Sequence, residues 1–251
     1  MGSLKRLAGK KIAVLATNGF EQVELEAPSA ALTEAGAKVT IIALHPGRIR
    51  GMRMHESADL MRVDQTISNA QTTEYDGLLI PGGYASPDLL RQSAQARSFV
   101  QQFDIAEKPI ALMSQAPLVL VSAGRAKNRV LTSWPGVRDD IVNAGATWLN
   151  QQVVCDANCL SGRGPQDIES FVAAIIPFFA AEASAVRSLS HGQSDPPQEM
   201  PLEPANQSLR WLAAPSVGAM LSLALLGVGV VAAQHARHKT GAADSDEATT
   251  Q

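Results

Sequence analysis

The chain has 251 residues, of which 45% are hydrophobic and 18% are charged, and its formal net charge is −3. This composition is typical of a globular protein with a full-sized core, and the slightly acidic balance argues against a nucleic-acid-binding surface. Two cysteines are too few for a disulfide framework. Residues 1–11 contain no apolar run, so we expect no secretory signal and place the N-terminal part in the cytoplasm.

Four short apolar segments predict buried strands. They are Ile12–Ala16, Val39–Leu44, Gly77–Ile80 and Ile110–Met113. Strands that are covered on both faces are nearly continuous in apolar residues, as these segments are. Because helical patterns separate the four segments, the alternation predicts a doubly wound parallel sheet with helices on both faces.

Two helices and two hairpins are also expected in this domain. The first helix ends at Gly36, and the last one closes the domain. Their apolar positions are Val23, Ala27, Ala30 and Ala31 in the first, and Ile168, Phe171, Val172, Ile175, Ile176 and Phe179 in the last. The hairpins are predicted over Arg48–Val63 and over Gln152–Ser161, where Asp-Ala-Asn suits a turn.

The composition changes near residue 183 and divides the chain into four parts. Residues 9–183 are expected to form the α/β domain, and residues 184–208, rich in Ser, Gln, Glu and Pro, a disordered linker. Residues 209–234 contain an uncharged run of about 23 residues, which is long enough to span a hydrocarbon core of ~30 Å. Residues 235–251 form a polar tail. We therefore expect a single-pass protein that contacts the lipid bilayer through residues 209–234.

The orientation of this span has two conflicting indications. The basic cluster His235–Lys239 follows the span, and the positive-inside rule would place the C-terminus inside. That orientation would require export of the whole domain without a signal. We therefore favour a cytoplasmic domain, as in a tail-anchored protein.

Three loops at the carboxyl ends of the expected strands carry the candidate site residues. Ser114 and Gln115 lie where a strand turns abruptly into a helix. Gly82 and Gly83 follow another strand, and Glu24 lies in the first helix. Such loops converge on one crevice in a doubly wound sheet. The glycine N–H groups could supply oxyanion donors there, and a desolvated Glu24 would have a raised pKa and could hold a proton.

Several spaced motifs occur together in one known family. They are Phe20-Glu21-x-x-Glu24 with Pro28, Pro81-Gly82-Gly83 with Pro87-Asp88, Arg129-x-x-Thr132-Ser133-Trp134-Pro135, Asp139-Asp140-x-x-Asn143-Ala144-Gly145-Ala146-x-Trp148, Val153-Val154-x-Asp156-x-Asn158 and Ser161-x-Arg163-x-Pro165-x-Asp167. On these motifs residues 10–180 resemble the PfpI-type branch of the DJ/PfpI superfamily, among the class I glutamine-amidotransferase-like folds. The resemblance implies a flavodoxin-like α/β sandwich and assembly into a homo-oligomer.

The sequence departs from this family at the catalytic turn. Relatives carry Cys-His-Gly-Pro, with the cysteine as nucleophile, whereas this chain has Ser114-Gln115-Ala116-Pro117. The peptidase, glyoxalase and deglycase activities of the family depend on a thiolate, and a serine hydroxyl needs a general base instead. Gln115 cannot be that base, and His45, after the second strand, is the histidine considered for it. Ser114 is therefore expected to be either a helix N-cap or a nucleophile or ligand contact.

The remaining candidates each have a structural alternative. Trp134 stands where relatives carry an aromatic residue or histidine near the pocket, and packing in the core is its alternative role. Asp88 matches an acidic position that reaches a neighbouring subunit's histidine in relatives, but Gln115 replaces that histidine here. Cys155 and Cys159 flank a turn and are expected to be free thiols, with a redox-labile pair as the alternative. We expect neither a metal site nor a cofactor.

The sequence thus favours a membrane-tethered domain that lacks the family's cysteine-dependent catalysis. Such a domain would bind a small molecule or act in a stress response. Its expected ligand-binding residues are Glu24, Gly82, Gly83, Ser114, Gln115 and Trp134. The alternative is a hydrolase in which Ser114 is the nucleophile and Glu24 or a recruited group is the base. A third hypothesis is a scaffold that oligomerises at the membrane and gains avidity there.

Overall fold

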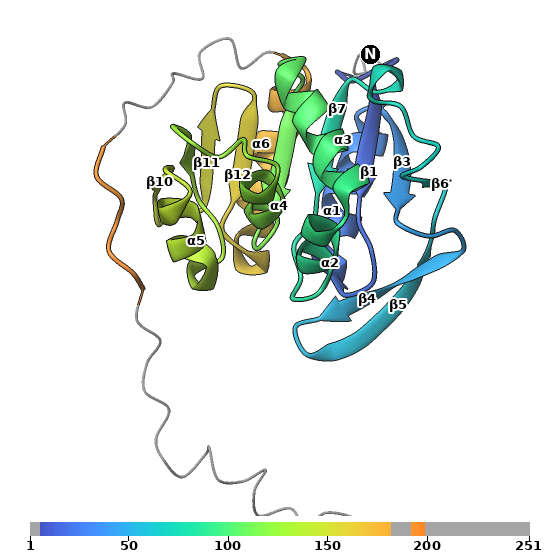
Figure 1. Ribbon diagram of the computed structural model, residues 1–251. Coiled ribbons are helices and arrows are strands. Elements are labelled where there is room, and N and C mark those ends of the chain that lie inside the picture. The colour runs from blue at the N-terminus through green and yellow to red at the C-terminus, as the bar shows by residue number, and fades with distance from the viewer. Residues whose placement is uncertain (1–5, 182–191, 199–251) are drawn as a thin grey trace, which may run out of the picture. The chain divides into compact units, whose positions relative to one another are not determined.

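The computed structural model describes residues 6–181 and 192–198. The first half of the domain alternates strands and helices (Figure 1). Its elements are β1 (Lys11–Leu15), β2 (Phe20–Glu21), α1 (Gln22–Glu34), β3 (Lys38–Ala43), β4 (Arg48–Arg53), β5 (Glu56–Arg62), β6 (Gln65–Thr66), the 3-10 turn η1 (Thr72–Glu74), β7 (Gly77–Ile80), α2 (Ser86–Gln92) and α3 (Ala94–Ile105).

The second half continues this alternation and ends on a helix that packs against α1. Its elements are β8 (Ile110–Met113), α4 (Pro117–Ser122), β9 (Val130–Leu131), η2 (Pro135–Val137), α5 (Arg138–Asn143), β10 (Thr147–Trp148), β11 (Val153–Asp156), β12 (Cys159–Gly162), η3 (Pro165–Asp167) and α6 (Ile168–Phe179).

Within the described residues, the central sheet has seven strands in the order β11-β12-β8-β7-β1-β3-β6. All neighbouring strands are parallel except β11 and β12, which form an antiparallel hairpin. The four predicted strands are confirmed: β7 and β8 have the predicted bounds, and β1 and β3 are displaced by one residue. The carboxyl ends of β1, β7 and β8 lie at the same edge, where the loops of the candidate site converge.

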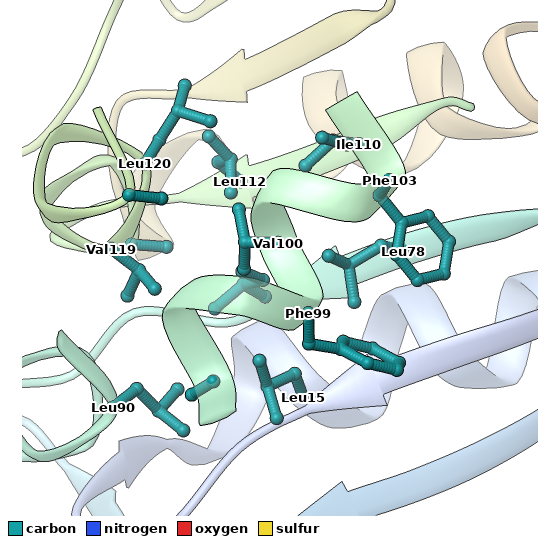
Figure 2. Packing of buried hydrophobic residues seen from close by; sticks show 14 of the residues in the cluster. Leu15, Leu78, Leu90, Phe99, Val100, Phe103, Ile110, Leu112, Val119 and Leu120 are labelled. Carbon is teal, nitrogen blue, oxygen red and sulfur yellow. The ribbon is translucent and has the colours of Figure 1, made fainter. Parts of the chain in front are cut away.

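Two hydrophobic clusters cover the two faces of this sheet. Side chains alternate along β1, so Ala13 and Leu15 join one cluster while Ile12 and Val14 join the other. The first cluster packs under α2, α3, α4 and α5, and Figure 2 shows Phe99, Val100 and Phe103 of α3 lying over strand residues such as Leu78 and Leu112. The second cluster packs under α1 and α6. This arrangement is the predicted α/β sandwich.

The face that α1 buries differs from the predicted one. The buried positions are Gln22, Glu24, Leu25, Pro28 and Leu32, while Ala30 is exposed and Val23, Ala27 and Ala31 are only partly buried. The apolar pattern misplaced the buried side of the helix because that side carries a carboxylate as well as apolar residues. In α6 the expected apolar face does close the domain, with Phe171, Ile175 and Phe179 buried.

In the described part of the chain three strand pairs remain, two of which were predicted as hairpins. The predicted hairpin at 48–63 is confirmed as the antiparallel pair β4–β5, which joins β2 in a separate sheet. The second predicted hairpin is confirmed as β11–β12, with Ala157 at a positive φ of 50° in its turn. Strands β9 and β10 form a short parallel pair beside α5.

The C-terminal predictions fall mostly outside the described residues. The expected membrane span 209–234 and the tail 235–251 lie beyond them. Among residues 6–181 and 192–198, no helix combines the length and apolar character needed to cross a bilayer. Within the expected linker, residues 192–198 are described, and they make hydrogen bonds with β10 and its neighbours.

Candidate functional site

Ser114 lies at the turn between β8 and α4 in an unusual backbone conformation. Its φ is 50°, in the left-handed region that few residues other than glycine adopt. Two hydrogen bonds hold the turn: Ser114 N–H donates to the Gly162 carbonyl (2.9 Å), and the Ser114 carbonyl accepts from Trp134 N–H (3.0 Å). Such local strain is often found at functional sites, and here the side chain is directed toward α1 rather than along α4.

The prediction that Ser114 caps helix α4 is wrong. The N-cap position of α4 is Ala116, and no side chain caps the helix. The Ser114 hydroxyl instead donates a hydrogen bond to Oε1 of Glu24, which comes from α1. Helix α4 begins at Pro117, so Ser114 lies two residues before the N-cap and is not at the capping position.

Glu24 is completely buried and holds two loops together. Its Oε1 accepts from Ser114, and its Oε2 accepts from Gly82 N–H (2.7 Å). Burial raises the pKa of Glu24 to about 7, because desolvation outweighs the two hydrogen bonds, and the nearby Glu21 raises it further. A carboxyl with that pKa changes protonation state near neutral pH, so it can hold a proton or accept one.

The two glycines are placed by close backbone packing. A Cβ on Gly82 would lie 2.5 Å from Ser114 Cβ, and one on Gly83, whose φ is 105°, would lie 2.3 Å from the Gly19 carbonyl oxygen. Their N–H groups are both engaged. Gly82 N–H donates to Glu24, and Gly83 N–H donates to Oε1 of Gln115 (3.1 Å). The expected oxyanion donors are therefore occupied by side chains of the protein itself.

A shallow pocket with a free volume of about 10 Å³, room for about one water molecule, opens beside Ser114. Its lining comprises Glu21, Glu24, Met54, Gly83, Tyr84, Ser114, Gln115, Trp134 and Pro165. The structure thus brings together the predicted residues Glu24, Gly83, Ser114, Gln115 and Trp134. Gly82 lies behind this lining, bonded to Glu24. Core packing of Trp134 does not occur, since it is half-buried at the pocket, whereas Trp148 is the fully buried tryptophan.

The β4–β5 hairpin contributes residues that sequence reasoning did not assign. Met54, at its tip, has a positive φ of 54° and donates its N–H to Glu21 Oε2 (3.0 Å). Next to it, the His55 ring stacks on Tyr84 with the ring centroids 5.5 Å apart. His45, the histidine considered from the sequence, is exposed and is not part of the pocket lining. The place of the hairpin tip in the pocket was hard to predict because the tip carries no sequence motif. The available signal was Glu21, its hydrogen-bond partner, which belongs to the motif Phe20-Glu21-x-x-Glu24.

The other candidates lie away from the pocket. Asp88 is exposed on α2, where it accepts a hydrogen bond from Gln92 (3.0 Å). In β11 and β12, Cys155 faces the cluster under α6, while Cys159 faces the cluster under α3 and α4. Since the two thiols lie on opposite faces of the sheet, they are not placed to pair, and burial raises the pKa of Cys155 to about 11 and that of Cys159 to about 12.

Across the described ranges, no three His, Cys, Asp or Glu side chains are grouped so as to hold a metal ion. The groups that the site presents are a serine hydroxyl, a buried carboxyl and backbone amides. The fold is that of a flavodoxin-like protein. Its site resembles a nucleophile turn, because a strained residue lies where a strand turns into a helix, beside a glycine loop at the carboxyl edge of the parallel sheet.

Comparison with known proteins identifies the family. The model of the DJ-1/PfpI family matches residues 10–177, so the chain belongs to that family. It is 36% identical over 162 residues to the deglycase PH1704 of Pyrococcus horikoshii, covering 64% of this chain and 95% of that one. The deglycase PfpI of Pyrococcus furiosus matches equally, with 36% identity over the same length and the same coverage.

Solved structures show the same fold. DJ-1beta of Drosophila melanogaster superposes with a TM-score of 0.63 at 25% identity, covering 68% of this chain and 90% of that chain. A two-domain protein of Anabaena variabilis, with DJ-1/ThiJ/PfpI-like and ferritin-like domains, gives a TM-score of 0.62 at 30% identity. That match covers 66% of this chain and 47% of the larger protein.

Proposed function

We propose that this domain binds a small molecule in the Ser114 pocket and lacks the thiol-dependent catalysis implied by the family resemblance. One observation carries the proposal: Oε1 of Gln115 accepts the hydrogen bond of Gly83 N–H. A reacting carbonyl would need that donor for its developing negative charge. The Gln115 side chain thus stands in the place of an oxyanion, beside a serine whose hydroxyl is bonded to Glu24.

The charges of the pocket favour ligands without a negative charge. Glu21 and Glu24 both line it, together with the rings of Tyr84 and Trp134, and its lining contains no lysine or arginine. Burial raises the pKa of Glu21 as well as that of Glu24. Where Glu21 and Glu24 are ionised, they would repel an anion, whereas an uncharged or cationic molecule would not be repelled. The free volume of about 10 Å³ admits only a small polar group of a ligand beside Ser114, with the rest of the ligand outside.

The binding proposal is tested with ligands of equal size and different charge. Ethylene glycol, 2-aminoethanol and glycolate are titrated into the full-length protein while the amide signals of Gly83 and Gln115 are followed by NMR. We expect shifts with the neutral and cationic compounds and weaker shifts with glycolate. If all three compounds shifted the signals equally, the predicted preference for uncharged and cationic ligands would be wrong. If none of them shifted the signals, binding in this pocket would be contradicted.

The loss of catalysis is tested by restoring the family's residues. We expect the wild-type protein to be inert toward methylglyoxal and the double variant Ser114→Cys, Gln115→His to turn it over. A thiol introduced elsewhere, as in Ser98→Cys on the exposed side of α3, serves as the control for non-enzymatic thiol chemistry. Wild-type turnover that Ser114→Ala abolishes would refute the proposal.

One observation favours the alternative, a hydrolase that uses Ser114. The hydroxyl donates to Glu24, and a carboxyl with a pKa of about 7 is suited to accept its proton at neutral pH. A serine-directed phosphonylating probe tests this directly. Labelling of Ser114 that is lost in Glu24→Gln supports the hydrolase, while absence of labelling in the wild type counts against it.

The sequence further supports a membrane tether through residues 209–234, with the α/β domain in the cytoplasm and a homo-oligomer formed through that domain. Oligomers on one membrane would gain avidity without new contacts. Alkaline extraction of membranes tests the tether, since a spanning segment stays in the pellet. Protease treatment of intact vesicles tests the orientation. Sedimentation of the detergent-purified protein over a range of concentrations tests the oligomeric state.

A further inference from the structure

Strand β10 has an inner and an outer edge. Its inner edge faces β9, because Thr147 N–H donates to the Arg129 carbonyl (2.8 Å) and Leu149 N–H donates to the Leu131 carbonyl (2.9 Å). Backbone groups of successive residues in a strand point in opposite directions. The N–H and carbonyl of Trp148, a fully buried residue, therefore point to the outer edge, where they need partners.

Residues 192–198 (orange in Figure 1) supply those partners. Trp148 N–H donates to Ser194 Oγ (3.0 Å), and Asp195 N–H donates to the Trp148 carbonyl (2.9 Å). The next outward amide, Asn150 N–H, donates to Asp195 Oδ2 (2.8 Å). Ser194 and Asp195 are half-buried, whereas the other five residues of the segment are exposed.

A side chain of α5 completes the contact. Arg138 Nε donates to the Asp195 carbonyl (2.8 Å), and the guanidinium lies over the Trp148 ring, 5.9 Å from its centroid. Thus the N–H, the carbonyl and the carboxylate of Asp195 are each bonded to the domain. Two of the four hydrogen bonds use side chains, Ser194 Oγ and Asp195 Oδ2, and these two select a serine followed by an aspartate. The other two use the backbone of Asp195.

The sequence after Asp195 suits an extended docked segment. Pro196 holds the residue before it in an extended conformation. Pro196 and Pro197 have no N–H groups, so they leave no donor unpaired where the segment leaves the strand edge. A segment with this restricted conformation loses less entropy on docking than a flexible one.

We propose that the outer edge of β10, together with Arg138, is a peptide-recognition edge whose occupant is the chain's own Ser194-Asp195-Pro196 segment. The segment binds by adding to the edge of β10 as a strand would, and the Ser194 hydroxyl accepts the Trp148 N–H in the place of a backbone carbonyl. The segment also covers an edge that would otherwise be open to other strands. The family match ends at residue 177, so this contact belongs to the part of the chain beyond the family domain.

Amide exchange of the full-length protein tests this proposal. We compare the wild type with the double variant Ser194→Ala, Asp195→Ala and with the control Gln193→Ala, whose side chain is exposed. Loss of the two side-chain acceptors should speed exchange of the Trp148 and Asn150 amides by about tenfold or more. The control should leave both rates unchanged, and the exchange of β1 and β8 should report that the domain is still folded.

A synthetic peptide, Gly-Gln-Ser-Asp-Pro-Pro-Gln, then tests recognition itself. We expect it to protect the same amides in the double variant and to bind the wild type at least about tenfold more weakly, because the edge is occupied there. A peptide with alanine for its serine and aspartate should protect neither amide. Equal exchange in wild type and double variant would overturn the proposal. Wild-type protection that disappears on dilution would replace the intramolecular occupant with a segment from a second copy.

Discussion

The buried carboxyl of Glu24 makes a quantitative prediction about stability and pH. Its pKa is raised from 4.5 to about 7 in the folded protein, mainly by desolvation. The folded state therefore binds this proton more tightly than the unfolded state, and the free energy of unfolding falls as pH rises between these two values. A pKa change of that size corresponds to about 3 kcal/mol.

The substitution Glu24→Gln should remove this pH dependence. Glutamine keeps an oxygen that can accept from Gly82 N–H and has an amide that can donate to Ser114 Oγ, so it mimics the protonated carboxyl. Relative to Glu24→Gln, the wild type should lose about 3 kcal/mol of unfolding free energy between pH 4.5 and pH 8. Urea unfolding at intervals across this range measures the difference.

Glu34→Gln is the matched control, because this glutamate is exposed at the end of the same helix. It should run parallel to the wild type at every pH. If Glu24→Gln also ran parallel to the wild type, the carboxyl would titrate as an ordinary exposed glutamate does. The argument from burial would then be refuted, together with the proton-holding role of Glu24.

Three further predictions concern backbone packing, the pocket and the thiols. Gly83→Ala should destabilise the fold by about 1–3 kcal/mol more than Gly47→Ala in urea unfolding, because both have φ above 100° but only Gly83 meets backbone atoms; equal losses would contradict this. Gln115→Ala frees Gly83 N–H and should strengthen ethylene glycol binding about 5-fold by NMR titration, whereas unchanged or weaker binding would show that Gln115 does not block the donor. Under oxidation Cys155 and Cys159 should stay unpaired by mass spectrometry, and Cys159 should resist alkylation until the protein unfolds, because it is fully buried; a disulfide in the folded protein would contradict their placement on opposite faces.

Much of the fold was predictable because the sheet is covered on both faces. Such strands must be apolar on both sides, so the ends of the apolar runs gave the exact bounds of β7 and β8. Helix α1 was harder, because periodicity looks for an apolar stripe and its buried side includes Glu24. A buried carboxyl breaks the rule that the buried side of a helix is apolar.

Part of the membership of the site was predictable from the sequence, but its hydrogen bonds were not. The topology brings the carboxyl ends of neighbouring strands together, which placed Ser114, Gly83 and Glu24 at one crevice. Whether Ser114 caps a helix depends on where α4 begins, and whether Gly83 N–H is open depends on the rotamer of Gln115. Neither is a property of local sequence, and the contribution of Met54 required a long-range contact between the hairpin tip and Glu21.

The protonation state of Glu24 distinguishes the two proposed functions by the sign of their pH dependence. When the carboxyl is ionised, the Ser114 hydroxyl donates to it, and proton transfer to a base becomes available. When the carboxyl is protonated, it can donate to Ser114 Oγ, and the serine hydrogen is released for an acceptor on a ligand. Hydrolysis through Ser114 should therefore increase as pH rises through about 7, while binding of a hydrogen-bond acceptor should strengthen as pH falls through about 7.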